Sequence, residues 1–415
     1  MESTRMNIVF EGGRLLDPRS GTIRDNTSVR VEDGRVKEVS QGTLAAGTAQ
    51  VIDVAGKIVM PGLIDCHVHV FLTEVNLRSL DQIPLTKLTA RASVLMRGMI
   101  MRGFTTVRDT GGADAGIREA VAEGSLLGPR LFISGAPISQ TGGHGDHRRP
   151  VENRLGCACC SALSFTSRVA DGVPDVIKAV RDELRKGADH IKIMCSGGVA
   201  SQNDPLESVQ YRMDEIEAAC EEANRWGRYV AAHAYSIDAV KRAVRGGVRT
   251  IEHGNLIDEE TAKLMAEKGA FLVPTLVTYD SMRRRGRDFG MTEYSLAKNA
   301  KVLEGGLRSL ELCRRAGVQI GFGTDLLGQL QNDESREFLI RGQIEKPIDT
   351  IRSATIVNAQ ILRQEGKLGE LVPGAWADVL VVDGNPLNDV NVLQDQGAHM
   401  PLIMKEGDIV KNALA

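Results

Sequence analysis

Short stretches in which apolar and polar residues alternate lie at both ends of the chain. They cover residues 7–10, 28–31, 36–39, 51–54 and 57–60 near the start and residues 378–382, 402–405 and 409–410 near the end. Alternation with a period of two is typical of strands that bury one face. We therefore expect residues 1–60 and 366–415 to form one β-sandwich domain that is built from both ends of the chain.

Between these ends, in residues 61–365, short apolar runs alternate with helical patterns. The runs cover residues 62–70, 105–109, 130–134, 190–195, 229–233, 249–253, 270–275 and 318–325. The helical patterns cover residues 176–186, 213–226, 237–245, 259–268 and 297–316. Strands that alternate with helices in this way predict an α/β fold, a (β/α)8 TIM-like barrel. The alternative, a doubly wound sheet, needs a Gly-rich phosphate turn after an early strand, and the sequence has none.

The segment of residues 135–172 interrupts this alternation. It is rich in Gly, Arg and Cys and has no clear periodicity. A connection of this length is usually a functional loop rather than a plain connector. The segment contains Cys157, Cys159 and Cys160, but a structural zinc needs four ligands in paired spacing and no second pair lies near.

Composition narrows the classes of protein that fit. The chain has 51 Lys and Arg against 54 Asp and Glu, a balance that argues against a nucleic-acid-binding protein. Seven cysteines in 415 residues do not form a disulfide scaffold and predict a reducing, cytoplasmic compartment. The chain starts without a signal-peptide pattern, and no apolar run is long enough to cross a membrane. We expect its partners to be a small-molecule substrate and further copies of the chain in a homo-oligomer.

Residues whose side chains bind metals close several of the apolar runs. His67 and His69 stand two positions apart, so both imidazoles point to the same side of a strand. His233, His253 and Asp325 each end a later run. In a parallel barrel the carboxyl ends of the strands meet at one face, where active sites gather. We therefore expect these five residues to meet at one candidate metal site.

Lys192 adds a sixth member to this set from the fourth apolar run. A buried, unpaired ammonium group is costly, so the side chain has two possible roles. It extends from the strand end to solvent, or burial lowers its pKa so that the neutral amine adds carbon dioxide. The resulting N6-carboxylysine is an anion with two oxygen atoms, which can bridge two metal ions.

The set resembles the metal ligands of the amidohydrolase superfamily, binuclear subtype. The resemblance covers nearly the whole chain and rests on residues 61–69, on Lys192, His233 and His253, and on Gly323-Thr324-Asp325. More narrowly, several stretches are similar to the prolidase-like metallo-dipeptidases and to ochratoxin-hydrolysing amidases. These are residues 140–145, 196–201, 233–235 and 251–255. Members of that branch cleave Xaa-Pro dipeptides or N-acyl amino acids that have a free C-terminal carboxylate.

The resemblance implies two zinc ions per chain, for which manganese or cobalt could substitute. His67, His69 and Asp325 would hold one ion, and His233 and His253 would hold the other. The carboxylated lysine and a hydroxide would bridge the two ions. Two metals lower the pKa of bound water, so this hydroxide would attack the amide carbon at neutral pH.

Two further side chains complete the expected mechanism. Asp325 takes the proton from the hydroxide and passes it to the leaving amine, as general base and then as acid. Tyr235 lies two residues beyond His233, and its hydroxyl could donate to the developing oxyanion. The alternative for Tyr235 is a purely packing role.

His144 is the candidate for binding the substrate carboxylate. It stands among glycines of the long segment, where the backbone can approach a ligand closely. Arg148 and Arg149 follow and could contribute charge, although a solvated surface role suits an arginine in such a segment. Asp109 ends the second run, and we expect it to pair with an arginine in a structural role.

Two other functions stay open. The first is a different amidohydrolase reaction on a cyclic amide, carbamate or lactone, as in imidazolonepropionase-like enzymes, or a deamination. Deaminases of the superfamily usually hold one metal and lack the bridging lysine, so Lys192 argues against them. The second is a catalytically inactive barrel that serves as a scaffold, but such a protein should have lost ligands and this chain has all six.

Overall fold

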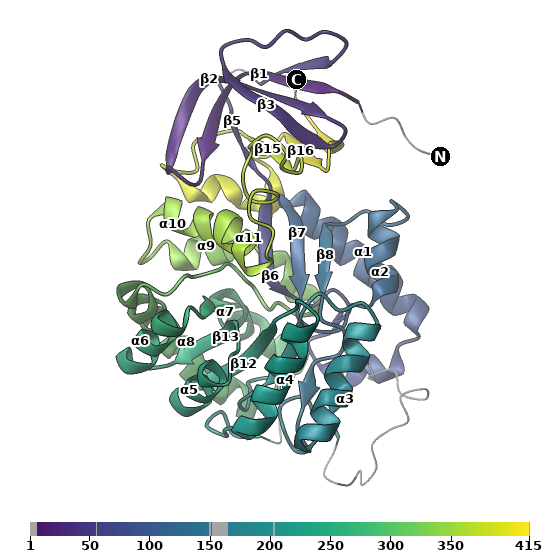
Figure 1. The fold of residues 1–415 in the computed structure, drawn as a ribbon, viewed down its shortest axis with the longest axis vertical. Helices are drawn as coiled ribbons and strands as arrows, with labels where there is room; N and C mark the ends of the chain where they lie inside the picture. The colour runs from purple at the N-terminus through teal and green to yellow at the C-terminus, as the bar shows by residue number, and fades with distance from the viewer. Residues whose placement is uncertain (1–5, 55, 149–150, 152–164, 202–203, 415) are drawn as a thin grey trace.

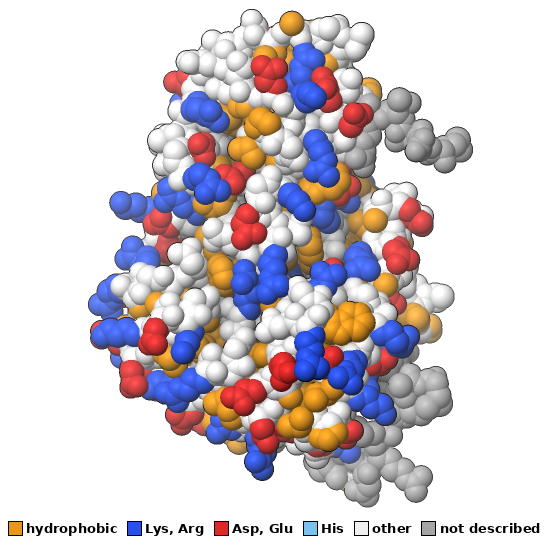
Figure 2. Space-filling model, viewed as in Figure 1, with side chains coloured by type: hydrophobic (Ala, Val, Ile, Leu, Met, Phe, Trp, Pro, Cys, Tyr) orange, Lys and Arg blue, Asp and Glu red, His pale blue; other side chains and the backbone are white. Residues whose placement is uncertain are grey.

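The computed structural model describes residues 6–54, 56–148, 151, 165–201 and 204–414. Cys157, Cys159, Cys160 and Arg149 lie outside the described residues. No described helix is both long enough and apolar enough to cross a membrane. On the face shown in Figure 2, basic and acidic side chains are interspersed over most of the surface.

Both ends of the chain join one eight-stranded sheet, at the top of Figure 1. Its strands are β1 (Ile8–Asp17), β2 (Thr22–Glu32), β3 (Arg35–Gln41), β4 (Gln50–Asp53), β5 (Ile58–Pro61), β15 (Val379–Val382), β16 (Leu402–Lys405) and β17 (Asp408–Asn412). Strand β5 links the two ends, because it pairs with β1 on one side and with β15 on the other. The alternating residues of both ends also share one apolar core that includes Phe10, Val31, Val379 and Met404.

The rest of the chain contains two parallel sheets. A three-stranded sheet consists of β6 (Leu63–Val68), β7 (Phe104–Asp109) and β8 (Arg130–Ile133). A six-stranded sheet consists of β9 (Ile138–Ser139), β10 (Arg168–Val169), β11 (Ile191–Met194), β12 (Val230–Ser236), β13 (Thr250–Leu256) and β14 (Phe271–Val273). Nearly every residue of β6, β7, β12 and β13 is buried, as expected for parallel strands that are covered on both faces.

Helices alternate with these strands, as the apolar spacing predicts (Figure 1). They are α1 (Leu85–Met101), α2 (Ala115–Ala122), α3 (Gly172–Arg185), α4 (Met213–Arg225), α5 (Ile237–Arg245), α6 (Glu259–Lys268), α7 (Leu276–Arg285), α8 (Glu293–Ala316), α9 (Arg336–Arg341), α10 (Pro347–Arg352) and α11 (Asn358–Ile361). Local signals set the ends of α6, where the Asp258 carboxylate accepts a hydrogen bond from Thr261 N and Gly269 has a left-handed φ of 67°.

The predicted eighth strand, at residues 318–325, differs from the structure. Only Ile320 forms a β-bridge, with Leu272, and residues 321–327 belong to no strand. The segment still joins the two parallel sheets, because Gly321 N donates to Leu272 O and Cys66 N donates to Phe322 O, both at 2.8 Å. Regular pairing ends where the chain turns into Asp325, whose φ of 50° lies in the left-handed region.

Candidate metal centre

The two histidines of the first parallel strand are oriented by hydrogen bonds to their Nδ1 atoms. His67 Nδ1 lies 2.7 Å from a carboxylate oxygen of Glu252, and His69 Nδ1 lies 2.7 Å from the carbonyl oxygen of Gly111. Because both partners accept hydrogen bonds, each ring carries its proton on Nδ1 and offers Nε2 as a ligand. Both Nε2 atoms face the same Asp325 oxygen, at 3.4 Å from His67 and 3.1 Å from His69.

Asp325 provides the negative charge of this group. Its backbone N donates to His67 O at 2.7 Å, which fixes the left-handed turn beside the histidine. Burial alone raises the pKa of Asp325, but the neighbouring His67 and His69 outweigh it and hold the pKa well below the usual carboxyl range. Ligand atoms of His67, His253 and Asp325 all lie within 4.8 Å of one another, so candidate ligands of both expected ions are close together.

His233 and His253 lie on the neighbouring strands β12 and β13, with ring centroids 4.7 Å apart. His233 Nε2 lies 3.1 Å from Gly197 O, which leaves Nδ1 as the possible ligand atom. His253 has a φ of 77°, a strained value for a residue with a side chain. Burial holds the pKa of both histidines well below the ordinary value, so both rings are neutral and able to bind a metal.

Lys192 lies on β11 with only 2% of its surface exposed. Burial lowers the pKa of its ammonium group to about 8. Within the described residues its Nζ makes no hydrogen bond, and the side chain lines the same cavity as the four histidines and Asp325. A buried amine whose pKa is lowered toward neutrality, next to metal-binding side chains, fits the carboxylated lysine that the resemblance implies.

Tyr235 lies in this cavity together with Tyr279, a residue of α7 that the sequence did not single out. Their hydroxyl oxygens are 2.8 Å apart, and the Tyr279 hydroxyl also lies 2.9 Å from His253 Nδ1. Both tyrosines are almost fully buried. The hydroxyl of Tyr235 therefore belongs to a pair, and its direction depends on Tyr279.

His144 reaches the cavity from the long segment and stacks on His233, with ring centroids 4.3 Å apart. Its Nδ1 lies 3.0 Å from Ser201 Oγ and 3.6 Å from a carboxylate oxygen of Asp204. Gly198 makes room for the ring, since a Cβ atom at that position would lie 2.0 Å from it. Ser201 and Asp204 engage Nδ1, so Nε2 is the nitrogen that can contact a ligand.

Arg148, the other predicted substrate-binding residue, forms an ion pair with Asp146 at 2.5 Å. It does not line the cavity, whereas the adjacent His147 does. The cavity itself measures about 70 Å³, and a neighbouring cavity of about 80 Å³ shares four of its lining residues. These are Leu77, His147, Ala200 and Met282.

Among the described residues no arginine pairs with Asp109, contrary to the expectation from the sequence. Its carboxylate accepts hydrogen bonds from the backbone N–H groups of Val70, Gly111 and Ala113, at 2.7–3.1 Å. The expected arginine pairing was wrong, because these three backbone N–H groups already occupy both carboxylate oxygens of Asp109. These bonds fix the segment after β6, which carries His69, so the role of Asp109 is structural as expected.

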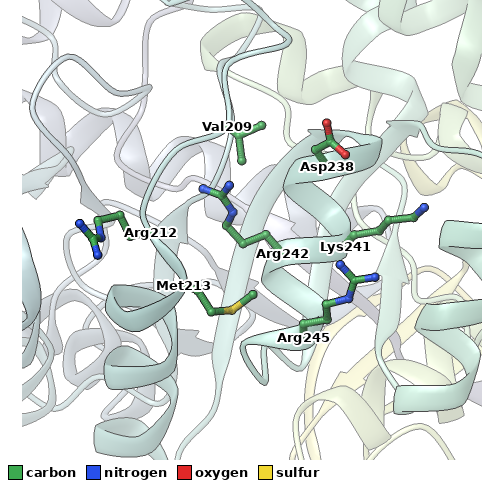
Figure 3. Close-up of a pocket in the computed structure, with 7 residues that line it drawn as sticks. All are labelled: Val209, Arg212, Met213, Asp238, Lys241, Arg242 and Arg245. Atoms are coloured by element: carbon green, nitrogen blue, oxygen red, sulfur yellow. The ribbon is translucent and has the colours of Figure 1, made fainter.

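A larger cavity, of about 500 Å³, lies away from this site between α5 and the start of α4 (Figure 3). Three of its basic side chains already have partners. Lys241 pairs with Glu260 at 3.0 Å, Arg212 pairs with Asp214 at 3.2 Å, and Arg242 donates to Tyr211 O at 2.8 Å. None of the predicted site residues lines this cavity.

Comparisons with known proteins agree with this geometry. The Amidohydrolase family profile matches residues 58–410. The ochratoxinase of Aspergillus niger is 31% identical over 99% of this chain and 88% of its own length. A crystal structure of a prolidase complexed with N-methylphosphonate-L-proline is 47% identical, covers 98% of this chain and 100% of the other, and superposes with a TM-score of 0.96.

A crystal structure of a further amidohydrolase is 52% identical, covers 99% of this chain and 100% of the other, and has a TM-score of 0.97. These neighbours imply a TIM-like barrel with an additional domain. Four imidazoles, one ionised carboxylate and a buried lysine form a donor set that suits two divalent metals. The chain belongs to the amidohydrolase family, and its structural neighbours include prolidases and ochratoxinase.

Proposed function

We propose that the chain is a zinc-dependent amidohydrolase that cleaves the amide bond of dipeptides or N-acyl amino acids. The observation that carries this proposal is the convergence of all six predicted ligands on one cavity. In the proposal His67, His69 and Asp325 hold one ion, and His233 and His253 hold the other. Lys192, once carboxylated, would be a ligand to both ions. The prolidase and ochratoxinase neighbours support the substrate class.

The proposal includes the architecture that presents these residues. The two parallel sheets form one closed barrel in residues 61–365, and residues 1–60 and 366–415 form the separate β-domain. The bridge between Ile320 and Leu272 and the bond from Cys66 N to Phe322 O support closure on one side. The homo-oligomer that we expect stays a prediction.

When bound, the two metals supply Lewis acidity toward the amide carbonyl and lower the pKa of water. The protein does the remaining work. Asp325 would accept a proton from the attacking water and return it to the leaving amine. Its low pKa keeps the Asp325 carboxylate ionised. In the proposal Tyr235, whose hydroxyl lies 2.8 Å from that of Tyr279, would donate a hydrogen bond to the carbonyl oxygen as negative charge develops there.

Binding of about two zinc ions per chain is the first test of this function. The metal-free protein should be inactive on a library of dipeptides and N-acyl amino acids, and zinc with bicarbonate should restore turnover. The reason is that six ligands exceed what one tetrahedral ion needs. Full activity in protein that elemental analysis shows to be metal-free would contradict the proposal.

A free carboxylate on the leaving amino acid should be required for efficient cleavage. A charge-assisted contact to Nε2 of His144 contributes about 1.5–3 kcal/mol, so amidation of the substrate should lower kcat/KM by at least ~10-fold. The measurement compares matched free-acid and amidated substrates.

His144→Ala should remove most of the difference between the two substrates. Arg148→Ala provides the comparison within the same segment, because Arg148 is paired with Asp146 outside the cavity lining. If the wild-type enzyme cleaves both substrates equally well, hydrolysis of a neutral amide, carbamate or lactone fits better than hydrolysis of an amino-acid amide.

A further inference from the structure

Glu252 contacts the proposed metal centre through His67 and has no place in the mechanism above. It stands on β13, one residue before His253, and none of its surface is exposed. Its Oε2 is 2.7 Å from His67 Nδ1. Its Oε1 accepts hydrogen bonds from Arg108 Nη2 at 2.8 Å and from Thr250 Oγ1 at 2.5 Å. The carboxylate therefore divides its two oxygens between a metal-ligand candidate and a buried cation.

Arg108 cannot turn away from this contact. It lies on β7 with none of its surface exposed. Its Nε donates to Cys66 O at 2.6 Å, beside His67, and its Nη1 contacts Thr250 Oγ1 at 3.1 Å. A guanidinium group has only donors, so it always demands an acceptor from residue 252. Arg108 thus determines which atom of residue 252 faces it, and thereby which atom of residue 252 faces His67.

We propose that Glu252, held by Arg108, is a positioning residue that keeps the proton of His67 on Nδ1 and thereby reserves Nε2 for metal. The inference rests on the proposed metal centre. It makes a specific prediction about an isosteric change. In Glu252→Gln the amide oxygen must face Arg108, so the NH2 group faces His67 Nδ1. His67 then accepts at Nδ1 and carries its proton on Nε2, where the proton blocks a metal.

The expected result for Glu252→Gln is zinc affinity that is about 10- to 100-fold weaker than in the wild type. Competition with a chromophoric chelator, with zinc as the only added ligand, measures this affinity without using activity. In the metal-free protein, ¹⁵N NMR of labelled histidine should show His67 changing from the Nδ1–H to the Nε2–H form. A merely structural role for Glu252 would not move that proton.

Glu345→Gln is the matched control. Glu345 pairs with the buried Arg341 at 2.7 Å, and both side chains are nearly unexposed, but no histidine takes part. This variant should carry a comparable cost to folding and keep wild-type zinc affinity. It separates the loss of a buried ion pair from the loss of histidine positioning.

The double variant Arg108→Met with Glu252→Gln gives the opposite result if the inference is correct. Without the guanidinium, the introduced glutamine side chain can turn its oxygen to His67, since the Thr250 hydroxyl accepts as well as donates. His67 should regain the Nδ1 proton, and zinc affinity should recover toward that of the wild type. Removing both charges also avoids a buried unpaired ion, so this variant tests the inference even if Glu252→Gln folds poorly.

Two results would overturn the inference. One is Glu252→Gln with unchanged zinc affinity and His67 still protonated on Nδ1. The other is a double variant that binds zinc as weakly as the single variant, or more weakly. If the wild type itself binds no zinc, the proposed function fails first, so the two failures are distinguishable.

Discussion

Asp325→Asn should bind substrate but turn it over ~10²–10⁴-fold more slowly, the usual contribution of one positioned proton-transfer group. Asparagine keeps the shape and one oxygen of the side chain but cannot take a proton from water or return it to an amine. The structure makes the substitution a local one. The carboxylate faces His67 and His69 inside the cavity, and the backbone N of residue 325 keeps its bond to His67 O.

The measurement separates kcat from KM at saturating zinc, with bound metal determined on the same samples. The introduced asparagine side chain still offers an oxygen ligand, so a loss of kcat at wild-type metal content indicates proton transfer. Glu345→Gln should leave kcat unchanged, because neither Glu345 nor its partner Arg341 lines the cavity. If kcat of the Asp325 variant falls less than about tenfold, Asp325 is a ligand or a structural residue rather than the proton shuttle.

Lys192→Ala should lower activity at least about 100-fold. Removing a residue that only hydrogen-bonds to a metal ligand typically costs up to about 100-fold, and removing the ligand itself should cost no less. The Lys192 amine is buried, and burial lowers its pKa to about 8. A lowered pKa favours the neutral amine, which is the form that reacts with carbon dioxide to give a carbamate. Alanine removes the bridge, so the variant should hold less than the wild-type amount of zinc. Elemental analysis and a zinc titration measure this directly.

Added short carboxylic acids test the bridging role of Lys192. A small carboxylate that enters the space left by the lysine offers the same two oxygens as the carbamate, so partial recovery of turnover is expected. Lys192→Arg is the control, since arginine retains the charge and cannot form a carbamate, and it should respond less. Wild-type activity in Lys192→Ala would exclude a bridge at this position.

The sequence predicted most of the elements because their signals are local. The ranges 237–245 and 259–268, predicted from apolar spacing, coincide with α5 and α6. The predicted start of α8 is late by four residues, at 297 instead of Glu293, since its first turn depends on the Thr292 cap rather than on an apolar face. The strand at 318–325 was wrong beyond Ile320, because a strand exists only where a partner offers regular hydrogen bonds.

The ligand candidates of the site, like the helices and strands, could be predicted from local sequence signals. His67, His69, His233, His253 and Asp325 could be found from sequence, because each closes an apolar run and parallel strands bring such ends to one face. Lys192 could be found because an amine inside an apolar run is costly. The match to the Amidohydrolase family confirms the family that these residues indicated.

What the sequence alone determined is therefore the strand and helix pattern and the residue types at the strand ends. Only the tertiary structure decided which neighbours orient them. In the sequence Glu252 is one residue of an apolar run, and only the packing of β6 against β13 shows its contact with His67. Likewise, the buried ion pair is formed by Arg108 with Glu252 and does not include Asp109. Tyr279 likewise acts through a contact with Tyr235 from another element. Hydrogen bonds between residues distant in sequence depend on packing geometry, and no local periodicity encodes that geometry.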